Sequence, residues 1–317
     1  MQREGSPWQG LGVVTLKELS DHLTSWRMLV LEWLVAITAV VSVFVAIKQV
    51  GEVTAEDPYL LLRFFTRGTP LPFVALLSFL VPLVSIGLGF DLVNSEHNQR
   101  TLSRVLSQPI YRDALLFGKF LAGLATISIS LVALWLLLIG LGLFMLGIPP
   151  GGEEVARALV FLLVTIAYAG VWLALALLLS ILFRSAATAA LAALGLWLFL
   201  TILWPLMMPL VANFFSPSDG DVLALLDTQV ILGRISPSAL FNEIVAVILD
   251  PSLRSTQQSM FAQMGLMLLE RGAVPGAPIP LLQSLLVVWG QIVGLVAGTI
   301  LLFVAGYVVF QRQEVRA

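Results

Sequence analysis

The chain has no cysteine, only two histidines and few charged residues, and each shortage excludes a class of chemistry. Without cysteine it forms no disulfide and offers no thiolate to a metal. His22 and His97 lie far apart in the sequence, which argues against a zinc site of the usual kind. The formal net charge is −2 and no basic run occurs, so nucleic acid is not an expected partner.

Catalytic motifs are missing as well. The sequence contains no G-x-x-x-x-G-K-[ST], no G-x-S-x-G and no H-E-x-x-H, so we expect no enzyme active site and no bound cofactor. Ionisable residues are also scarce in the apolar stretches. Glu32, Asp91 and Lys119 each lie near the end of a stretch that we expect on the cytosolic side. Ion-coupled transporters need such groups at depth in the membrane, so this composition disfavours a secondary transporter.

Apolar residues are what the chain has in excess. They make up 59% of it, against roughly 45–50% in soluble proteins, and the mean hydropathy is +0.98. A membrane-spanning helix needs about 20 mostly apolar residues. Six stretches meet this requirement and predict an all-α integral membrane protein with six transmembrane helices: Leu29–Ile47, Leu71–Leu92, Leu115–Leu146, Leu159–Phe183, Thr188–Val211 and Leu282–Phe310.

The distribution of basic residues predicts the orientation. Most of the 17 Lys and Arg residues fall near the two termini or in the connections on the same side, which the positive-inside rule assigns to the cytosol. The first residues are too charged for a cleaved signal peptide. Within residues 1–28, apolar residues at helical spacing over Leu11–Trp26 predict an amphipathic helix in the cytoplasmic interface. An ordinary cytosolic helix is the alternative.

The longest polar connection, residues 212–281, is predicted to form a helical segment outside the cell. Ser236 followed by Pro237 is typical of a helix start, and Ser255 with Gln258 forms a second start. The leucine-rich residues 222–232 are expected to dip into the outer interface.

Three methionines on the second of these helices, Met260, Met264 and Met267, share one helix face. Thioethers can hold Cu(I), which makes a metal site conceivable. Packing against the membrane or an external partner is the better-supported interpretation, because methionine is a flexible packing residue.

The connection between the second and third stretches, residues 91–114, has a distinctive pattern. Residues 96–106 can form a short amphipathic helix, and Pro109 ends it because proline disfavours the helical conformation of the residue before it. A short charged helix held between two spans is suited to docking in the groove of a partner. A solvated loop packed on its own spans is the alternative.

This connection resembles that of the permease subunits of ABC-2 type ABC exporters. Those proteins carry a pattern like E-x-x-x-G-T-L, then L-S-x-P-[IV]-S-R, then G-K. The matching residues are Glu96, Thr101, Leu102, Leu106, Ser107, Pro109, Ile110, Arg112, Gly118 and Lys119. The chain departs at Arg100, where the family often has Gly, and at Tyr111, where Ser is usual. The N-terminal helix and the short basic tail are also similar, so the resemblance covers essentially the whole chain. It is also similar, more distantly, to the permease of the copper-maturation system of nitrous oxide reductase.

The resemblance implies a multi-pass protein of a prokaryotic cell (inner) membrane that pairs with a second permease copy or a paralogue. Each protomer would bind a separate cytosolic ATPase subunit, which uses ATP and Mg. The implied coupling residues are Glu96, Arg100, Thr101, Leu102, Arg104, Leu106, Pro109 and Arg112.

Spans two and five face the pathway in that family. This makes Ser78, Ser85, Thr201 and Trp204 candidates for pathway lining, although Ser and Thr also pack routinely between membrane helices. The apolar lining favours a hydrophobic or lipid-like cargo.

Three functions remain open on the sequence. The first is an export permease, and the second is a mechanical membrane subunit that acts on an extracytoplasmic partner without moving a solute. The third is a scaffold or secondary transporter unrelated to ABC proteins. A neighbouring ATPase gene would separate the first two from the third, and a continuous polar cavity between two copies would separate the first from the second.

Overall fold

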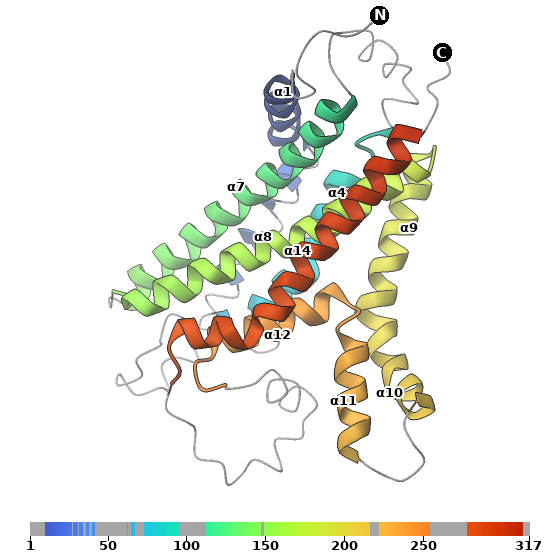
Figure 1. Cartoon of the computed structure of the whole chain (residues 1–317). Coiled ribbons are helices and arrows are strands. Elements are labelled where there is room, and N and C mark those ends of the chain that lie inside the picture. Colours follow the sequence, from blue (N-terminus) through green and yellow to red (C-terminus); the bar gives the residue numbers. More distant parts are fainter. Residues whose placement is uncertain are drawn as a thin grey trace, which may run out of the picture.

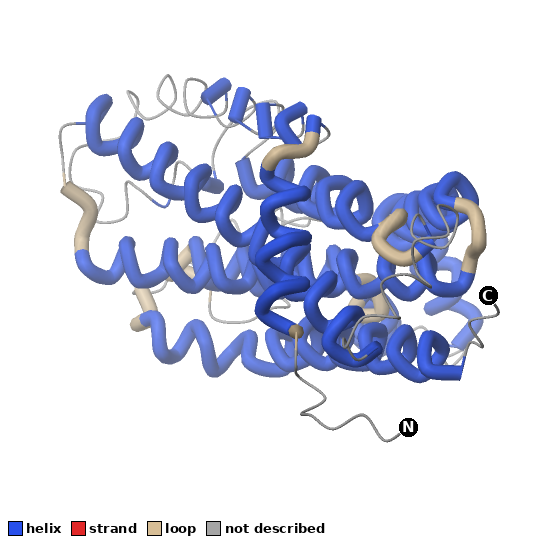
Figure 2. Tube along the Cα trace, turned by 90° about the horizontal axis from the view of Figure 1, so that it is seen from above, coloured by secondary structure: helices blue, strands red, loops and turns tan. Residues whose placement is uncertain are grey.

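The computed structural model describes residues 10–26, 28–30, 32–33, 36–37, 40–41, 62, 65–66, 73–94, 112–146, 149–215, 222–253 and 278–312. Within these ranges every regular element is a helix, which confirms the all-α prediction for this part of the chain. The named elements are α1 (Leu11–Leu23), α4 (Phe73–Gly89), α7 (Arg112–Leu146), α8 (Gly152–Leu182), α9 (Ala186–Leu198), the π-helix η1 (Phe199–Leu203), α10 (Trp204–Phe215), α11 (Val222–Gly233), α12 (Pro237–Leu249) and α14 (Leu281–Arg312). Figures 1 and 2 show them as a bundle of helices.

Four helices of the described part are long and apolar enough to cross a membrane: Asp113–Phe144, Gly152–Leu182, Ala186–Phe214 and Leu281–Arg312. They correspond to the last four predicted spans. A bent helix pair raises the number of candidate spans to five, and α4 is a shorter apolar helix within the second predicted stretch. The first predicted stretch, 29–47, lies largely outside the described residues.

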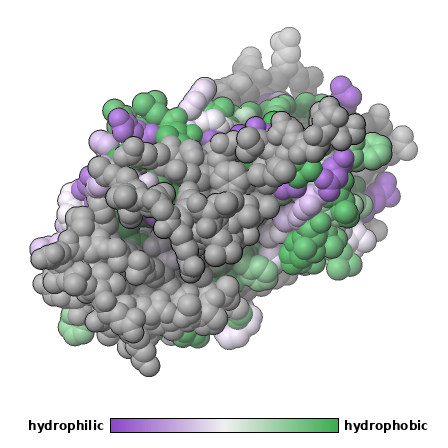
Figure 3. All heavy atoms as spheres, turned by 90° about the horizontal axis from the view of Figure 1, so that it is seen from below, coloured by the Kyte–Doolittle hydropathy of each residue, from purple (hydrophilic) through white to green (hydrophobic). Residues whose placement is uncertain are grey.

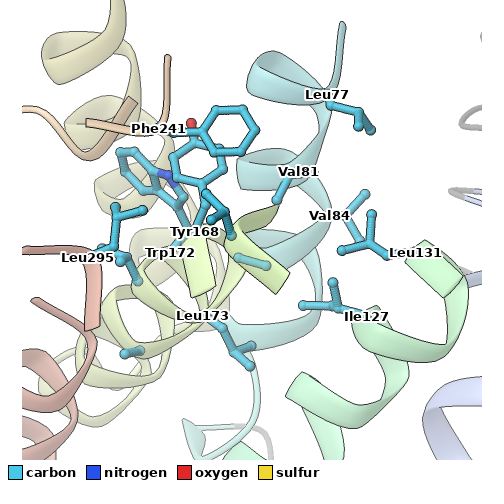
Figure 4. Packing of buried hydrophobic residues seen from close by; sticks show 14 of the residues in the cluster. Leu77, Val81, Val84, Ile127, Leu131, Tyr168, Trp172, Leu173, Phe241 and Leu295 are labelled. Atoms are coloured by element: carbon cyan, nitrogen blue, oxygen red, sulfur yellow. The ribbon is translucent and has the colours of Figure 1, made fainter. Parts of the chain in front are cut away.

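Helix α8 is the centre of the bundle. Of its most apolar 18-residue window, 72% is buried, whereas the corresponding fraction of α14 is 17%. Its neighbours are α4, α7, α12 and α14. Figure 4 shows how Tyr168 and Trp172 of α8 meet Phe241 of α12, and the Tyr168 and Phe241 rings stack with their centroids 4.4 Å apart.

Small residues allow the closest helix contact. A side chain at Gly89 of α4 would place its Cβ 2.6 Å from the Cβ of Ala176 on α8, which no real contact tolerates. Lipid tails are as apolar as leucine, so membrane helices associate through such close packing rather than through a hydrophobic driving force. The sequence Gly-Leu-Gly-Phe at the end of α4 therefore fixes how near α4 lies to α8.

Large apolar side chains remain exposed around the bundle, as expected where the solvent is lipid. Leu191, Leu210 and Phe214 on the α9–η1–α10 helix are 70%, 71% and 86% exposed. Figure 3 shows apolar side chains gathered at the surface seen from below.

The α11–α12 pair belongs to the segment that the sequence predicts outside the cell. The helix that begins after Ser236 is present, but it packs against α8, α14 and α4 inside the bundle. Phe241, Ile244 and Val247 are fully buried there. The two helices meet at an angle of 111°, which is typical of a broken span or a re-entrant loop. The cause is the apolar character of α12, which is stabilised by burial against other helices rather than by exposure to water.

Helix α1 is present as the amphipathic pattern predicted, and it packs on the start of α7. Its large apolar residues Val13 and Leu16 are 71% and 68% exposed, whereas Val14 is buried. A Cβ at Gly118 of α7 would lie 2.7 Å from the Val14 side chain, so this glycine is what admits α1. Figure 1 places α1, the start of α7 and the end of α14 at the same end of the bundle, which we call the α1 end.

Candidate functional site

The predicted coupling residues mostly lie outside the described residues. This holds for Glu96, Arg100, Thr101, Leu102, Arg104, Leu106 and Pro109, whereas Arg112 is the first residue of α7. The flanks of the connection are described. At the start of the connection, the backbone N–H groups of Val93 and Asn94 donate to Ser180 Oγ of α8 at 3.0 and 3.3 Å. The chain therefore enters the connection from a point fixed on the central helix.

At the end of the connection, the first turn of α7 is hydrogen-bonded to the end of α14. Tyr307 donates from its hydroxyl to Asp113 Oδ1 at 3.1 Å, and Gln311 donates to the same oxygen through its side-chain amide. Movement of the start of α7 therefore has to move or release the end of α14.

A buried ion pair ties α7 to α1 two turns further on. Lys119 Nζ lies 3.2 Å from Glu18 Oε1, and the two residues are only 3% and 7% exposed. Lys17 adds a second ion pair to the same oxygen at 3.0 Å, from a side chain that is 61% exposed. The family-like Gly118-Lys119 dipeptide thus has a physical role, because the glycine admits α1 and the lysine binds it.

The carboxyl of Glu18 is held in its ionised form. Burial by itself would raise its pKa, but the charge of Lys119 and the hydrogen bonds from Lys17 and Lys119 outweigh burial and lower the pKa below the ordinary 4.5. A lowered pKa in the folded state stabilises the fold above the unfolded pKa, and this contribution is lost as the pH falls through the folded value. Burial also lowers the pKa of nearby His22 below its ordinary 6.5, so its imidazole is neutral at pH 7.

A second polar cluster lies near the middle of α8, and it unites two of the candidate pathway residues. The Tyr168 hydroxyl donates to the carbonyl oxygen of Ser78 at 2.9 Å and shares a hydrogen bond with Ser238 Oγ at 2.8 Å. Ser238 Oγ in turn lies 3.1 Å from Thr201 Oγ1. Three hydroxyl groups and the Ser78 carbonyl thus join four helical elements, α4, α8, η1 and α12.

The other two candidates are placed differently. Trp204 donates from its indole N–H to the carbonyl of Leu232 at 2.9 Å, so it lies at the bend between α11 and α12. Ser85 is fully buried and donates to the carbonyl of Val81 in its own helix at 2.8 Å. Sequence reasoning missed Tyr168 and Ser238. The available indication was a tyrosine in an otherwise apolar span, since a buried tyrosine hydroxyl usually has a hydrogen-bond partner.

A cavity of about 180 Å³ opens beside this cluster, at the bend between α11 and α12. We call this helix pair the hairpin. The described residues that line it are Thr201, Trp204, Pro205, Met208, Gly233, Ser236, Ser238, Ala239, Asn242 and Glu243. Glu243 accepts from the side-chain amide of Gln291 at 2.9 Å and from Arg234 Nε at 3.2 Å. Below, "the hairpin cavity" means this space.

Among the described residues no group of three or more His, Cys, Asp or Glu side chains could hold a metal ion. Met260, Met264 and Met267 lie outside the described part of the chain, so the copper hypothesis stays a prediction.

Comparison with known proteins assigns the class. Residues 13–315 match the family described as "ABC-2 family transporter protein", and the chain belongs to this family. It is therefore a multi-pass membrane permease subunit of an ABC transporter, which implies a partner ATPase subunit.

Two curated relatives carry the name "Probable ABC transporter permease protein NosY". The one from Pseudomonas aeruginosa is 30% identical over 201 residues, which cover 62% of this chain and 68% of the relative. The one from Stutzerimonas stutzeri is 27% identical over the same length and the same shares. The family resemblance drawn from the loop motif is thus confirmed.

Proposed function

We propose that the chain is the membrane subunit of an ATP-driven exporter, and that residues 91–114 couple it to a cytosolic ATPase. The α1 end then faces the cytosol, in the cell membrane of a prokaryote, beside a second copy or a paralogue. The observation that carries the proposal is the double tie of α7, to α14 through Asp113 and to α1 through Lys119. A push on the coupling segment would reach three helices within two turns.

The physical principle is a population shift. If the permease has two arrangements that the ATPase binds with different affinity, ATP binding and hydrolysis move the equilibrium between them. In this proposal the Glu18–Lys119 ion pair keeps α1 and the first turns of α7 together in both arrangements, so that the two helices move as a unit. The proposed cargo is hydrophobic or lipid-like, because the spans that would line the pathway are apolar and uncharged.

The test is co-purification and reconstitution with the cognate ATPase. We expect no ATP hydrolysis by the chain alone, hydrolysis by the complex, and ATP-dependent movement of a fluorescent lipid analogue in proteoliposomes. Glu96→Ala or Arg112→Ala should lower assembly or coupled hydrolysis, while Arg184→Ala, an exposed basic position between α8 and α9, serves as the control. ATPase activity of the isolated chain, or wild-type coupling in both variants, would overturn the proposal.

One observation favours the mechanical alternative enough to keep it. The fully buried guanidinium of Arg157 on α8 donates to the carbonyls of Ile248 and Ile279, at 2.8 and 2.6 Å. These residues stand on either side of residues 254–277, so motion of α8 would pass to both ends of that segment. If ATP hydrolysis in the complex moves no lipid analogue but is stimulated by an external partner protein, the mechanical function replaces export.

A further inference from the structure

One carboxylate of the apolar stretches has no counter-ion in the described part of the chain. Glu32 accepts a hydrogen bond from Ser130 Oγ of α7 at 3.0 Å, and no described residue forms an ion pair with it. Glu243 of the hairpin cavity differs, because Arg234 and Gln291 both donate to its carboxylate. Ionisable groups within membrane spans are costly, and they commonly pair with one another or mark a functional site.

The contact with Ser130 fixes the depth of Glu32. Ser130 stands eleven residues after Lys119 on the same helix, which is about 16 Å along the helix axis. Ionic contacts such as the Glu18–Lys119 pair belong at the membrane surface, and the hydrocarbon core is about 30 Å thick. Ser130 and Glu32 therefore lie near the middle of the core, deeper than the place of Glu32 at the start of its apolar stretch suggests.

Glu32 and Ser130 line a cavity of about 230 Å³, which we call the Glu32 cavity. The other described residues that line it are apolar, and those on α7 include Ile127, Leu134 and Leu137, which recur at helical spacing. An apolar cavity of about 150 Å³ is large enough to hold benzene. The Glu32 cavity therefore has room for a somewhat larger apolar group next to the carboxylate.

The charge of the lining selects the class of ligand. Glu32 is the only charged side chain among the described residues that line the cavity. A lipid acyl chain would fill the apolar part but leave the carboxylate without compensation, and an anion would be repelled by it. Phospholipid head groups that carry an ammonium group stand at the membrane surface, not at its middle. A positively charged group on a short hydrocarbon chain satisfies both parts of the lining.

We propose that the Glu32 cavity binds a small hydrophobic amine. Its ammonium group pairs with the carboxylate of Glu32, which Ser130 holds in position, and its hydrocarbon part lies along α7 against Leu134. The inference does not rest on the proposed export function, because the cavity contains none of the proposed coupling or pathway residues. Binding is measured on the permease without its ATPase, so the two proposals can fail separately.

The test compares three probes of one chain length that differ in charge. Hexylamine is a cation at pH 7, as a lysine side chain is, whereas hexan-1-ol is neutral and hexanoate is an anion. The full chain is reconstituted in phosphatidylcholine nanodiscs, and calorimetry on empty nanodiscs corrects for partition into the lipid. The Kd of hexylamine should be at least about tenfold lower than that of hexan-1-ol, as expected for a hydrogen bond between charged groups. Equal binding of hexylamine and hexan-1-ol, preferential binding of hexanoate, or no binding of hexylamine would overturn the proposal.

Variants locate the site. Glu32→Gln should abolish the preference for hexylamine over hexan-1-ol, and Ser130→Ala should weaken hexylamine binding about fivefold. Ser128→Ala is the matched control, because it removes a hydroxyl of the same helix that donates to the Leu124 carbonyl and does not line the cavity. Ala133→Phe fills the cavity from an exposed position and should abolish binding of both hexylamine and hexan-1-ol. A preference that survives Glu32→Gln, or hexylamine binding unchanged by Ala133→Phe, would overturn the assignment to this cavity.

A last arm tests the depth of the site. Octylamine, which can bring its ammonium group to the middle of the membrane, should displace hexylamine. Lysophosphatidylethanolamine, whose ammonium group stays at the surface, should not displace it. Displacement by the lysolipid as effective as that by octylamine would show that the site takes a lipid head group, and it would overturn the proposal.

Discussion

The α1 end and the hairpin at α12 hold helices together by different means. At the α1 end the contacts are ionic, and Glu18, Lys119 and Asp113 join helices that are distant in the sequence. At the hairpin a chain of hydroxyl groups around Tyr168 and Ser238 stands beside two ion pairs, Arg157–Glu153 and Arg234–Glu243. A helix end that receives force from an ATPase needs strong, directional contacts. Hydroxyl groups form contacts that can exchange partners when helices move. Under the proposed function, force from the ATPase would enter at the α1 end, and the hairpin would be the region whose hydroxyl groups exchange partners as the helices move.

The largest effect is expected where the hairpin is anchored. Arg157 is fully buried and donates to Glu153, Ser284 and two backbone carbonyls. Arg157→Ala leaves the buried Ile248 carbonyl and Ser284 hydroxyl without this donor and frees the Ile279 carbonyl, so stability should fall by about 3–5 kcal/mol. Thermal unfolding in detergent measures the loss, with the exposed Arg184→Ala as control. A loss equal to that of the control would show that the hairpin is held by apolar packing alone.

A smaller loss is expected at the α1 end. Lys119→Met leaves Glu18 with only the exposed Lys17 as its cation, which should cost about 2 kcal/mol. The double variant Glu18→Leu/Lys119→Met removes both charges and should recover part of that loss, and Glu18→Leu completes the set of single variants. The pair is coupled only if the effects of the single variants fail to add, which a double-mutant cycle measures. Lys17→Ala is the control. Additive effects would show that the Glu18–Lys119 pair is not energetically coupled and has no part in the proposed coupling.

The smallest effect comes from a pair of tyrosines that compares the two regions directly. Tyr168→Phe removes a buried hydroxyl with two partners and should cost about 1–2 kcal/mol. Tyr307→Phe removes a half-buried hydroxyl that bonds to Asp113, so its effect on stability should be less than about 1 kcal/mol. In the complex the order should reverse, with Tyr307→Phe lowering coupled ATP hydrolysis more than Tyr168→Phe does. If Tyr168→Phe had the larger effect on both stability and coupled ATP hydrolysis, the two regions would not have different roles.

The sequence predicted the fold class well and the site only in part. Apolar stretches of sufficient length predicted four spans that the structure contains, and the loop motif predicted the family that the comparison confirmed. Thr201 and Trp204 were chosen from the fifth span and do line a cavity. Glu243 and Ser238 were missed, because they stand in a segment whose length and polar flanks suggested a location outside the membrane.

Composition and spacing by themselves determined that the chain is helical and lies in lipid, and they predict a partner-binding motif between its second and third predicted spans. These properties follow from local chemistry, since a helix satisfies its own backbone groups and an apolar stretch seeks lipid wherever it stands. Only the tertiary structure decided that α12 turns back into the bundle, that Gly118 and Lys119 receive α1, and that Tyr168 joins four helical elements. Such contacts join residues tens to more than a hundred positions apart. Their energy depends on distances between side chains, which no local pattern specifies.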